Sequence, residues 1–354
     1  MKNSKHNHQE NNHTRSNPTM SKKIILIAII SLFALTILYF TGAFNRDAVT
    51  AQRFVNLQQG DKTHEGFRRA HAKGICLAGS FESTGELAKY SQAKVFDLGA
   101  TPFVGRFSIA GNNPTAPDLK APVRSLAFSI TTDDNQEWRV AMNTPPVMAV
   151  ATPDAFFKQL QALSPDPVTK KRSPEKIKAF FAAHPESAAF NNWKASYQPT
   201  SSFATEQYHS INAFYLVDEN DEKHAVRWIA KPQLSDENTQ PLNNDSPDAL
   251  QLQLKDQVAQ APIKFDMLFS FATEEDDENN PTVLWPQSRK TINAGTLVIT
   301  RLQAQEGGVC ENMNFDPLVL PTGIEPSADP ILRARGAAYA ESFRRRAKEV
   351  LLNN

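Results

Sequence analysis

The segment VRSLAFSITTDDNQEWRVAMN, residues 123–143, decides the fold class of this chain. In its first half Leu126, Phe128 and Ile130 alternate with smaller or polar residues, and the alternation resumes over Trp138–Met142 after the polar turn DDNQ. Alternation with a period of two residues is typical of a strand with one buried face, and a short polar turn between two such runs is typical of a hairpin. The segment therefore predicts two adjacent antiparallel strands.

Further strands of the same kind follow this hairpin in the sequence. A second hairpin is predicted where residues 212–217 precede the polar turn DENDE and residues 224–230 follow it. Strict alternation from Ile263 to Phe271 predicts another strand, and residues 296–302 predict one more. Strand patterns thus dominate from about residue 72 to residue 304.

Helices interrupt and follow these strands. Pro153–Leu163 and Pro174–Ala183 each begin with proline, which is favoured in the first turn of a helix, and Ser173 is suited to cap the second of them. Three more helices are expected, over Ala48–Gln59, after Ser246-Pro247-Asp248, and over Asp329–Leu352. Because hairpin connections outnumber crossovers, the expected fold class is α+β, an antiparallel sheet or barrel with helices packed outside it.

The charge of the chain is balanced, with 38 Lys and Arg residues against 38 Asp and Glu residues among 354. Such a balance gives no electrostatic footprint for nucleic acid, so no nucleic-acid partner is expected. Beyond the N-terminal segments about 310 residues remain, which suits one large domain or two small ones with ample core.

The N-terminal residues differ in composition from the rest of the chain. Residues 1–23 are rich in Asn, His and Lys with almost nothing apolar, and this composition predicts a disordered tail. Residues 24–44 form an uncharged, mostly apolar run, and about 20 apolar residues can span a bilayer as a helix. Since the cationic residues precede this run, the positive-inside rule leaves the tail in the cytoplasm and places the bulk of the chain outside it.

The apolar run is either an uncleaved anchor or a signal segment. Thr41-Gly42-Ala43 resembles a cleavage site of small residues, whereas the length of the run favours an anchor. We therefore expect a periplasmic, extracytoplasmic protein held in the inner membrane by its N-terminal helix, with its domain over residues 45–354.

The chain contains only two cysteines, Cys76 and Cys310. An exported compartment permits a disulfide, but two cysteines this far apart in sequence do not show one. Neither has the spacing of a metal site, so two buried free thiols are the expectation.

Seven motifs occur in a fixed order along the chain. They are HAKG at His71–Gly74 with Phe81-Glu82 after it, PFVGRFS at Pro102–Ser108, MNTPP at Met142–Pro146, FYLVDENDE at Phe214–Glu222, LWPQ at Leu284–Gln287, GTLVITR at Gly295–Arg301 and LPTGIEPSADPILRARGAAYAESFRRR at Leu320–Arg346. As an ordered set they resemble the haem catalase family. The resemblance implies an antiparallel catalase-type β-barrel with flanking helices, a C-terminal haem-ligating helix, and haem b as cofactor.

Within that family the chain most resembles the minimal, catalase-related peroxidases. It stops just after the terminal helix, without the further helical region of ordinary catalases, and its N-terminal arm is short. The resemblance therefore implies a haem edge that is more open than in a full-length catalase.

Tyr339, in RARGAAY, matches the iron-ligating tyrosine of the family. Without the resemblance, a tyrosine in a helix would be read as a core residue. Arg335 lies one helical turn earlier on the same face, where a guanidinium favours the phenolate that ligation requires. Asp329, earlier in the same segment, is expected to hold this arginine.

His71 matches the distal histidine of the family, and a neutral imidazole can take a proton from one peroxide oxygen and deliver it to the other. Asn143 matches the amide that orients peroxide, and Ser108 matches the hydroxyl that positions the imidazole. Considered singly, these would be a structural histidine, a turn residue and a hydroxyl on a strand face.

Arg68, Arg106 and Arg346 match residues that hold the haem propionates, for which a planar bidentate donor is suited. Two positions depart from the family pattern. Met148 stands where an aromatic ring over the haem is common, with Phe156 retaining another ring, and Asn212 replaces a histidine usual before the FYLV strand. These changes put a high catalatic turnover in doubt but not haem binding.

The expected function is an exported haem peroxidase that reduces hydrogen peroxide or organic hydroperoxides, oxidises a small organic donor and has weak catalatic activity. One rival is a true hydrogen peroxide dismutase, for which residues 240–262 would have to fold over the haem. Another is a haem-binding or haem-sensing module without turnover, although a mere carrier needs only Tyr339 and the arginines. The sequence leaves the donor and the oligomeric state open.

Overall fold

The computed structural model describes residues 24–33, 48–239, 242 and 244–353. Two compact units are present, Met1–Ala48 and Val49–Asn354. In the first, residues 24–33 form a helix, and the predicted tail at 1–23 lies outside the described residues. Over the described parts of the chain, no helix combines the length and the apolar character needed to cross a membrane.

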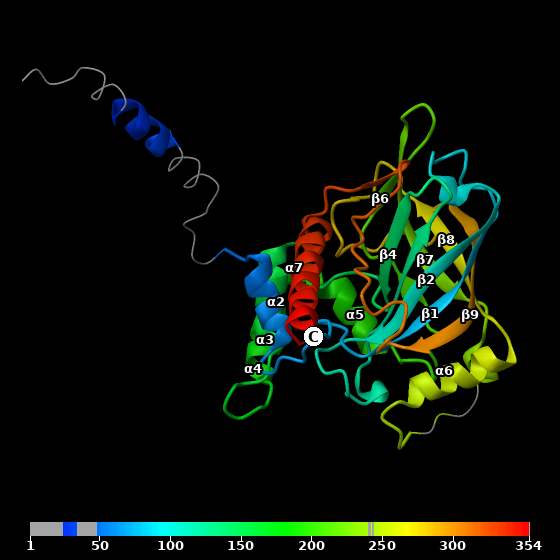
Figure 1. The fold of residues 1–354 in the computed structure, drawn as a ribbon, viewed down its shortest axis with the longest axis horizontal. Helices are drawn as coiled ribbons and strands as arrows, with labels where there is room; N and C mark the ends of the chain where they lie inside the picture. Colours follow the sequence, from blue (N-terminus) through cyan, green and yellow to red (C-terminus); the bar gives the residue numbers. More distant parts are fainter. Residues whose placement is uncertain (1–23, 34–47, 240–241, 243, 354) are drawn as a thin grey trace, which may run out of the picture. The chain divides into compact units, whose positions relative to one another are not determined.

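The strands of the second unit form a closed antiparallel barrel (Figure 1). Around the barrel the order is β7-β5-β4-β3-β2-β1-β9-β8, and β8 pairs again with β7 to close it, while β6 and β10 extend from β7. The strands are β1 (Gly74–Ser83), β2 (Gly99–Ile109), β3 (Arg124–Thr131), β4 (Glu137–Asn143), β5 (Tyr208–His209), β6 (Phe214–Val217), β7 (Lys223–Pro232), β8 (Ile263–Phe271), β9 (Thr291–Ala304) and β10 (Ile324–Pro326). The predicted α+β class and both predicted hairpins are confirmed.

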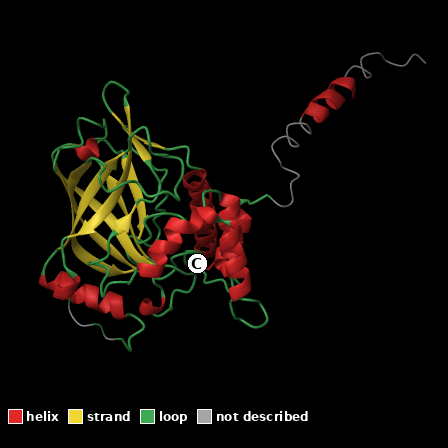
Figure 2. Ribbon diagram, turned by 180° about the vertical axis from the view of Figure 1, so that it is seen from behind, coloured by secondary structure: helices red, strands yellow, loops and turns green. Residues whose placement is uncertain are grey.

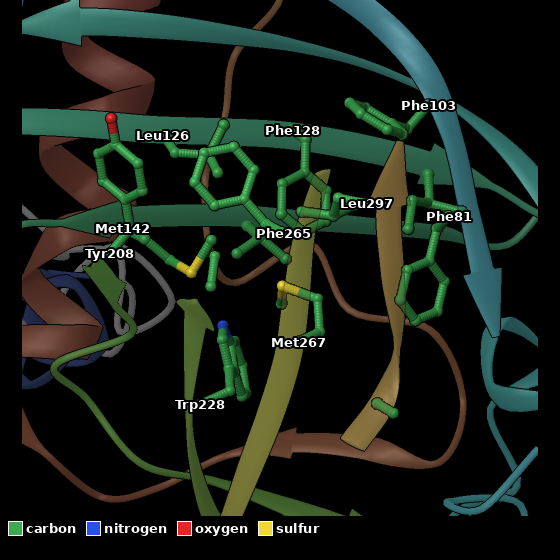
Figure 3. Close-up of a cluster of buried hydrophobic side chains, with 14 of the residues drawn as sticks. Phe81, Phe103, Leu126, Phe128, Met142, Tyr208, Trp228, Phe265, Met267 and Leu297 are labelled. Atoms are coloured by element: carbon green, nitrogen blue, oxygen red, sulfur yellow. The ribbon is translucent and has the colours of Figure 1, made fainter. Parts of the chain in front are cut away.

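The barrel interior is filled by the apolar residues that alternate along each strand (Figure 3). Trp138 of β4 is 1% exposed, and its ring centroid lies 5.8 Å from that of Phe128 and 5.6 Å from that of Trp228. Phe265 and Met267 of β8 enter the same core fully buried. The barrel is therefore packed with side chains, and the outer face of its strands is left to form a site.

Helices flank the barrel (Figure 2). They are α2 (Ala51–Gln59), α3 (Pro153–Leu163), α4 (Pro174–Ala183), α5 (Ala188–Ser196), α6 (Ala249–Gln260) and α7 (Pro330–Asn353), with short 3-10 helices η1 (Lys94–Phe96), η2 (Asp118–Lys120), η3 (Pro185–Ser187) and η4 (Asp236–Asn238). Helices α2, α3 and α7 pack on one another beside the barrel, whereas α6 packs against β9 and η2.

The helix boundaries follow local capping. Ser173 caps α4 by accepting a hydrogen bond from the Lys176 amide, as predicted. The first helix of the domain begins at Ala51 rather than Ala48, because the Thr50 side chain accepts from the Arg53 amide and so fixes the start.

The expectation of two free thiols is wrong. Cys76 of β1 and Cys310, in the segment after β9, form a disulfide with a Cα–Cα distance of 5.3 Å. The two residues are 234 positions apart, so only the closure of β9 onto β1 brings them together.

Replacement of Trp138 by alanine should destabilise the barrel, because it removes a ring that four aromatic neighbours enclose. We expect the free energy of unfolding in urea to fall by about 3–5 kcal/mol. The control is Leu98→Ala, at a side chain that is 81% exposed, for which the change should stay within about 0.5 kcal/mol. Equal losses in the two variants would contradict a close-packed interior.

Candidate active site

A cavity of about 430 Å³ lies beside the outer face of the barrel. Residues of α2, α3 and α7 line it together with residues of β2, β3 and β4. The structure brings all nine site residues expected from the sequence to this one cavity: Arg68, His71, Arg106, Ser108, Asn143, Phe156, Arg335, Tyr339 and Arg346.

The strand register explains the polar part of the cavity. Ser108 of β2 pairs with Ser125 of β3, and Ser125 pairs with Asn143 of β4. Their chain neighbours Phe107, Leu126 and Met142 enter the barrel core. Because successive side chains of a strand point to opposite faces, the three polar residues form one row on the outer face.

His71 lies three residues before β1 and has an unusual backbone conformation, with φ of 54°. Its carbonyl accepts a hydrogen bond of 2.7 Å from Arg106 Nη2, and the same nitrogen donates 3.1 Å to the Ala72 carbonyl. A left-handed backbone in a non-glycine residue persists only where its surroundings enforce it. Arg106 supplies that constraint.

Gly74 gives Arg106 the space to reach these carbonyls. A Cβ at this position would lie 2.6 Å from the Arg106 guanidinium carbon and 2.3 Å from the Phe107 carbonyl oxygen. The glycine of the HAKG motif is therefore required first by the close approach of the β2 backbone and also by that of the guanidinium.

The imidazole of His71 joins a chain of hydrogen bonds. Its Nδ1 lies 3.1 Å from Ser125 Oγ, and the Ser125 hydroxyl donates to Asn143 Oδ1. Since a serine has one hydroxyl hydrogen, Ser125 accepts from His71 and Nδ1 must carry the hydrogen. The neutral ring then presents a free lone pair at Nε2.

This contact corrects one expectation. The sequence assigns the hydroxyl that positions the imidazole to Ser108, whereas the hydroxyl on His71 belongs to Ser125. Ser108 lies one strand away in the same row and lines the cavity. The register of the predicted hairpin, which sets Ser125 opposite Asn143, was the signal that could have identified it.

Burial keeps His71 neutral. Removal of the ring from water, and then the nearby guanidinium groups of Arg106, Arg335 and Arg68, lower the pKa of His71 to about 4. A histidine with such a pKa is an uncharged proton acceptor at neutral pH.

Helix α7 presents several cavity residues along one face. Arg335, Tyr339, Ser342 and Arg346 are spaced by three or four positions and all line the cavity, as one side of a helix requires. The Tyr339 ring packs against the buried cluster of Cys76, Cys310 and Phe315.

Arg335 is held through Asn212 rather than directly by Asp329. Its Nη1 donates to Asn212 Oδ1 at 2.5 Å and its Nη2 to the Ala141 carbonyl at 3.1 Å. Asn212 Nδ2 in turn donates to Asp329 Oδ2 at 2.6 Å. The asparagine that departs from the family pattern therefore bridges the carboxyl group of Asp329 and the guanidinium of Arg335.

Arg68, Arg106 and Arg346 form a concentration of positive charge at the cavity. Burial, and after it the charges of Arg106 and Arg346, lower the pKa of Arg68 well below its ordinary value. Burial, then Arg346, lowers the pKa of Arg106 to about 9. Among the described residues, none of the three forms an ion pair with a carboxylate, and Arg346 Nε has no hydrogen-bond partner. The cluster therefore favours an anionic ligand.

Apolar side chains form the rest of the wall. The Phe156 ring of α3 lies 5.4 Å, centroid to centroid, from that of Phe54 in α2, and Met148 also lines the cavity. Phe54 was not singled out from the sequence, because nothing local distinguishes a phenylalanine on a pocket wall from one in a core.

The chain is similar in sequence to proteins of one known family. The family model described as Catalase matches residues 51–351. A catalase-related peroxidase of Synechococcus elongatus is 35% identical over 327 residues, covering 92% of this chain and 96% of its own, and one of Mycolicibacterium paratuberculosis is 28% identical, covering 79% and 89%.

Catalase A of Saccharomyces cerevisiae is similar in structure, with a TM-score of 0.71 at 20% identity. The match covers 81% of this chain and spans 62% of the yeast chain. At 20% identity the similarity to the yeast structure shows the fold alone. The family is shown by the Catalase model, which matches residues 51–351. The chain belongs to the catalase family and is an oxidoreductase that acts on peroxide.

Proposed function

We propose that this protein is an exported haem b peroxidase that reduces hydrogen peroxide or organic hydroperoxides and oxidises a small organic donor, with weak catalatic activity. One observation carries the proposal. A single cavity collects a neutral histidine in a hydrogen-bonded chain, a tyrosine on a helix, and three guanidinium groups that form no ion pair with a carboxylate in the described part of the chain.

The residues fit haem. A porphyrin needs apolar walls, which Phe54, Phe156 and Phe343 provide, in a cavity whose volume lies within the range usual for cofactor sites. Its two propionates would meet the cationic cluster of Arg68, Arg106 and Arg346, where planar donors suit carboxylates. Tyr339 would be the protein ligand of the iron, a phenolate that donates charge strongly.

When bound, haem would supply the redox chemistry by which peroxide is reduced and a donor is oxidised. The side chains of the chain would move the proton. Nε2 of His71 would accept it from one peroxide oxygen and return it to the other, so that water can leave. Asn143 uses Oδ1 to accept from Ser125, which leaves its NH₂ group to orient the peroxide.

Two features support peroxidase over dismutase activity. Met148 gives the wall a flexible thioether where a rigid ring would narrow it. In addition, no described residue of the segment 240–262 lines the cavity, since α6 packs against β9 and η2. The described residues of the segment that would rebuild a tight channel for a dismutase thus lie elsewhere. A haem-binding module without turnover would have no use for the His71–Ser125–Asn143 chain.

Export is supported by the uncharged run at 24–44 with cations on its N-terminal side. The Cys76–Cys310 disulfide adds to this, because disulfides persist mainly in oxidising compartments. We propose a periplasmic location with the N-terminal segment in the inner membrane. Peroxide and a small organic donor would be the partners, and no nucleic acid is involved.

Replacement of Tyr339 by phenylalanine should abolish tight haem binding, because it removes the oxygen that would ligate the iron. The measurement is a haem titration of the apoprotein followed by absorbance, in which the wild type should give a high-spin ferric spectrum. Tyr215→Phe is the matched control, since that hydroxyl donates to Glu278 outside the cavity. The proposal fails if Tyr339→Phe keeps the spectrum and the affinity of the wild type.

Replacement of His71 by alanine should keep haem but slow the reaction with peroxide by about 10²-fold or more, the usual scale for a positioned acid–base group. His184→Ala, which removes an imidazole outside the cavity, is the control. Stopped-flow absorbance after mixing with peroxide gives both rates. A His71→Ala protein that reacts as fast as the control would remove the histidine from the mechanism.

The pH dependence of the same reaction provides a further check. Because burial and then Arg106 lower the pKa of His71 to about 4, the imidazole is neutral above this pH and protonated below it. The rate should be constant near neutrality and should fall as the pH drops through about 4. A fall centred near the ordinary histidine value would show that the ring is not held as described.

Consumed peroxide should pass mainly to the donor and not to oxygen. Oxygen evolution and donor oxidation are measured in one reaction at saturating dye donor, for the wild type and for Met148→Phe. The substitution restores a ring to the wall, so the oxygen share should rise in the variant. Oxygen as the main product of the wild type would identify the protein as a small catalase.

A further inference from the structure

The disulfide joins the barrel to an irregular segment that borders the cavity. Cys76 lies on the outer face of β1, paired with Arg106 of β2. Residues Cys310–Asn314, here called the cysteine loop, follow β9 and form neither helix nor strand. Both cysteines are fully buried, and the Cys310 amide also donates to Cys76 Sγ at 3.2 Å. The loop is thus fixed to the strand that begins just after His71.

The carbonyl groups of the cysteine loop hold two arginines of the cationic cluster. Arg68 Nη2 donates to the Cys310 carbonyl at 3.0 Å and to the Met313 carbonyl at 2.8 Å. Arg346 Nη1 donates to the Glu311 carbonyl at 2.8 Å. Arg68 precedes β1 whereas Arg346 belongs to α7, so one short loop aligns guanidinium groups from two distant parts of the fold.

These bonds leave donors for a ligand. A guanidinium has five N–H donors, and the loop uses only some of them: Arg346 Nε is buried without a partner among the described residues. Arginines that are already held in place lose less side-chain freedom when they bind an anion, and this raises affinity.

The loop and the tyrosine pack against the same buried cluster. Met313 and the Tyr339 ring both pack against the cluster of Cys76, Cys310 and Phe315, and the Arg68 guanidinium carbon lies 5.8 Å from the centroid of the Phe315 ring. A shift of the loop would therefore disturb both the arginines and the cluster against which Tyr339 packs.

We infer that the Cys76–Cys310 disulfide positions Arg68 and Arg346 for the carboxylates of the cofactor, so that haem affinity depends on it. This inference rests on the proposed haem-binding function. Without the bond, the loop loses its tie to β1, and the carbonyls that orient the two guanidinium groups become mobile.

Removal of a disulfide also lowers global stability by freeing the unfolded chain, so the experiment must separate the two effects. The test variant is Cys76→Ala with Cys310→Ala. The matched control is Met267→Ala, which opens a hole in the barrel core and leaves the cysteine loop intact. Thermal unfolding of each apoprotein measures the loss of stability, and haem titration with transfer of haem to a scavenger protein measures affinity and release.

We expect the disulfide-free variant to bind haem about tenfold more weakly and to release it faster, while Met267→Ala stays within about twofold of the wild type. Arg68→Gln should weaken haem binding less in the disulfide-free background than in the wild type, because residues that act together are not additive. Equal weakening in Met267→Ala and the disulfide-free variant, or additive effects of Arg68→Gln, would overturn the inference.

Wild-type protein in which a phosphine has reduced the disulfide to two thiols provides a second measure with unchanged side-chain volume. It should show the same weakening, and reoxidation should restore affinity. Oxidised wild type that binds no haem would overturn the proposed function and this inference together. Tight binding by wild type, disulfide-free variant and reduced protein alike would overturn this inference alone.

Discussion

The two-sided alternation of β2, β3 and β4 is the constraint on which the rest of the structure depends. One set of alternate residues, including Phe107, Phe128 and Trp138, fills the barrel, and the other set faces the cavity. Because the two faces are interleaved residue by residue, a shift of one position in register would put Arg106 and Asn143 into the apolar core. The packing of the barrel therefore fixes the position of the site residues. A change that destabilises the barrel is expected to alter the geometry of the site as well.

The positive charges at the cavity lower the stability of the folded protein when no ligand is bound. Positive groups that are removed from water and form no ion pair with a carboxylate among the described residues disfavour the folded state. Burial, followed by mutual repulsion, lowers the pKa of Arg68 and of Arg106. A dianionic ligand would offset this cost, so ligand binding and folding stability are expected to be coupled. Functional sites are the usual place for such local conflict with stability.

Neutral hydrogen-bond acceptors among the described residues, and not carboxylates, hold the arginines of the cavity in place in two ways. Backbone carbonyls of the cysteine loop hold Arg68 and Arg346, and carbonyls of His71 and Ala72 hold Arg106. On α7 a neutral amide, Asn212, separates Arg335 from Asp329. Neutral acceptors orient a guanidinium while leaving its charge available to a ligand, whereas a carboxylate in direct contact would neutralise it.

The sequence by itself determined the fold class, the strands β3, β4, β6, β7, β8 and β9, and the residues that meet at the cavity. Period-two alternation and proline-capped helix starts act over a few residues, so local pattern was enough to predict both hairpins and the bounds of α3 and α4. The ordered motifs, and the positions matched beside them, were enough to identify nine residues that line one cavity.

Contacts between distant segments were decided only by the tertiary structure. The disulfide forms because β9 pairs with β1. The hydroxyl that contacts His71 depends on which of two serines in one row is nearer to Nδ1. The cysteine loop meets Arg346 only because α7 packs beside the barrel. Such contacts depend on barrel closure and on helix placement. Both result from the sum of many small packing energies across the chain. No short stretch of sequence contains that sum, and for this reason the residue types of the site were predictable while their hydrogen-bond partners were not.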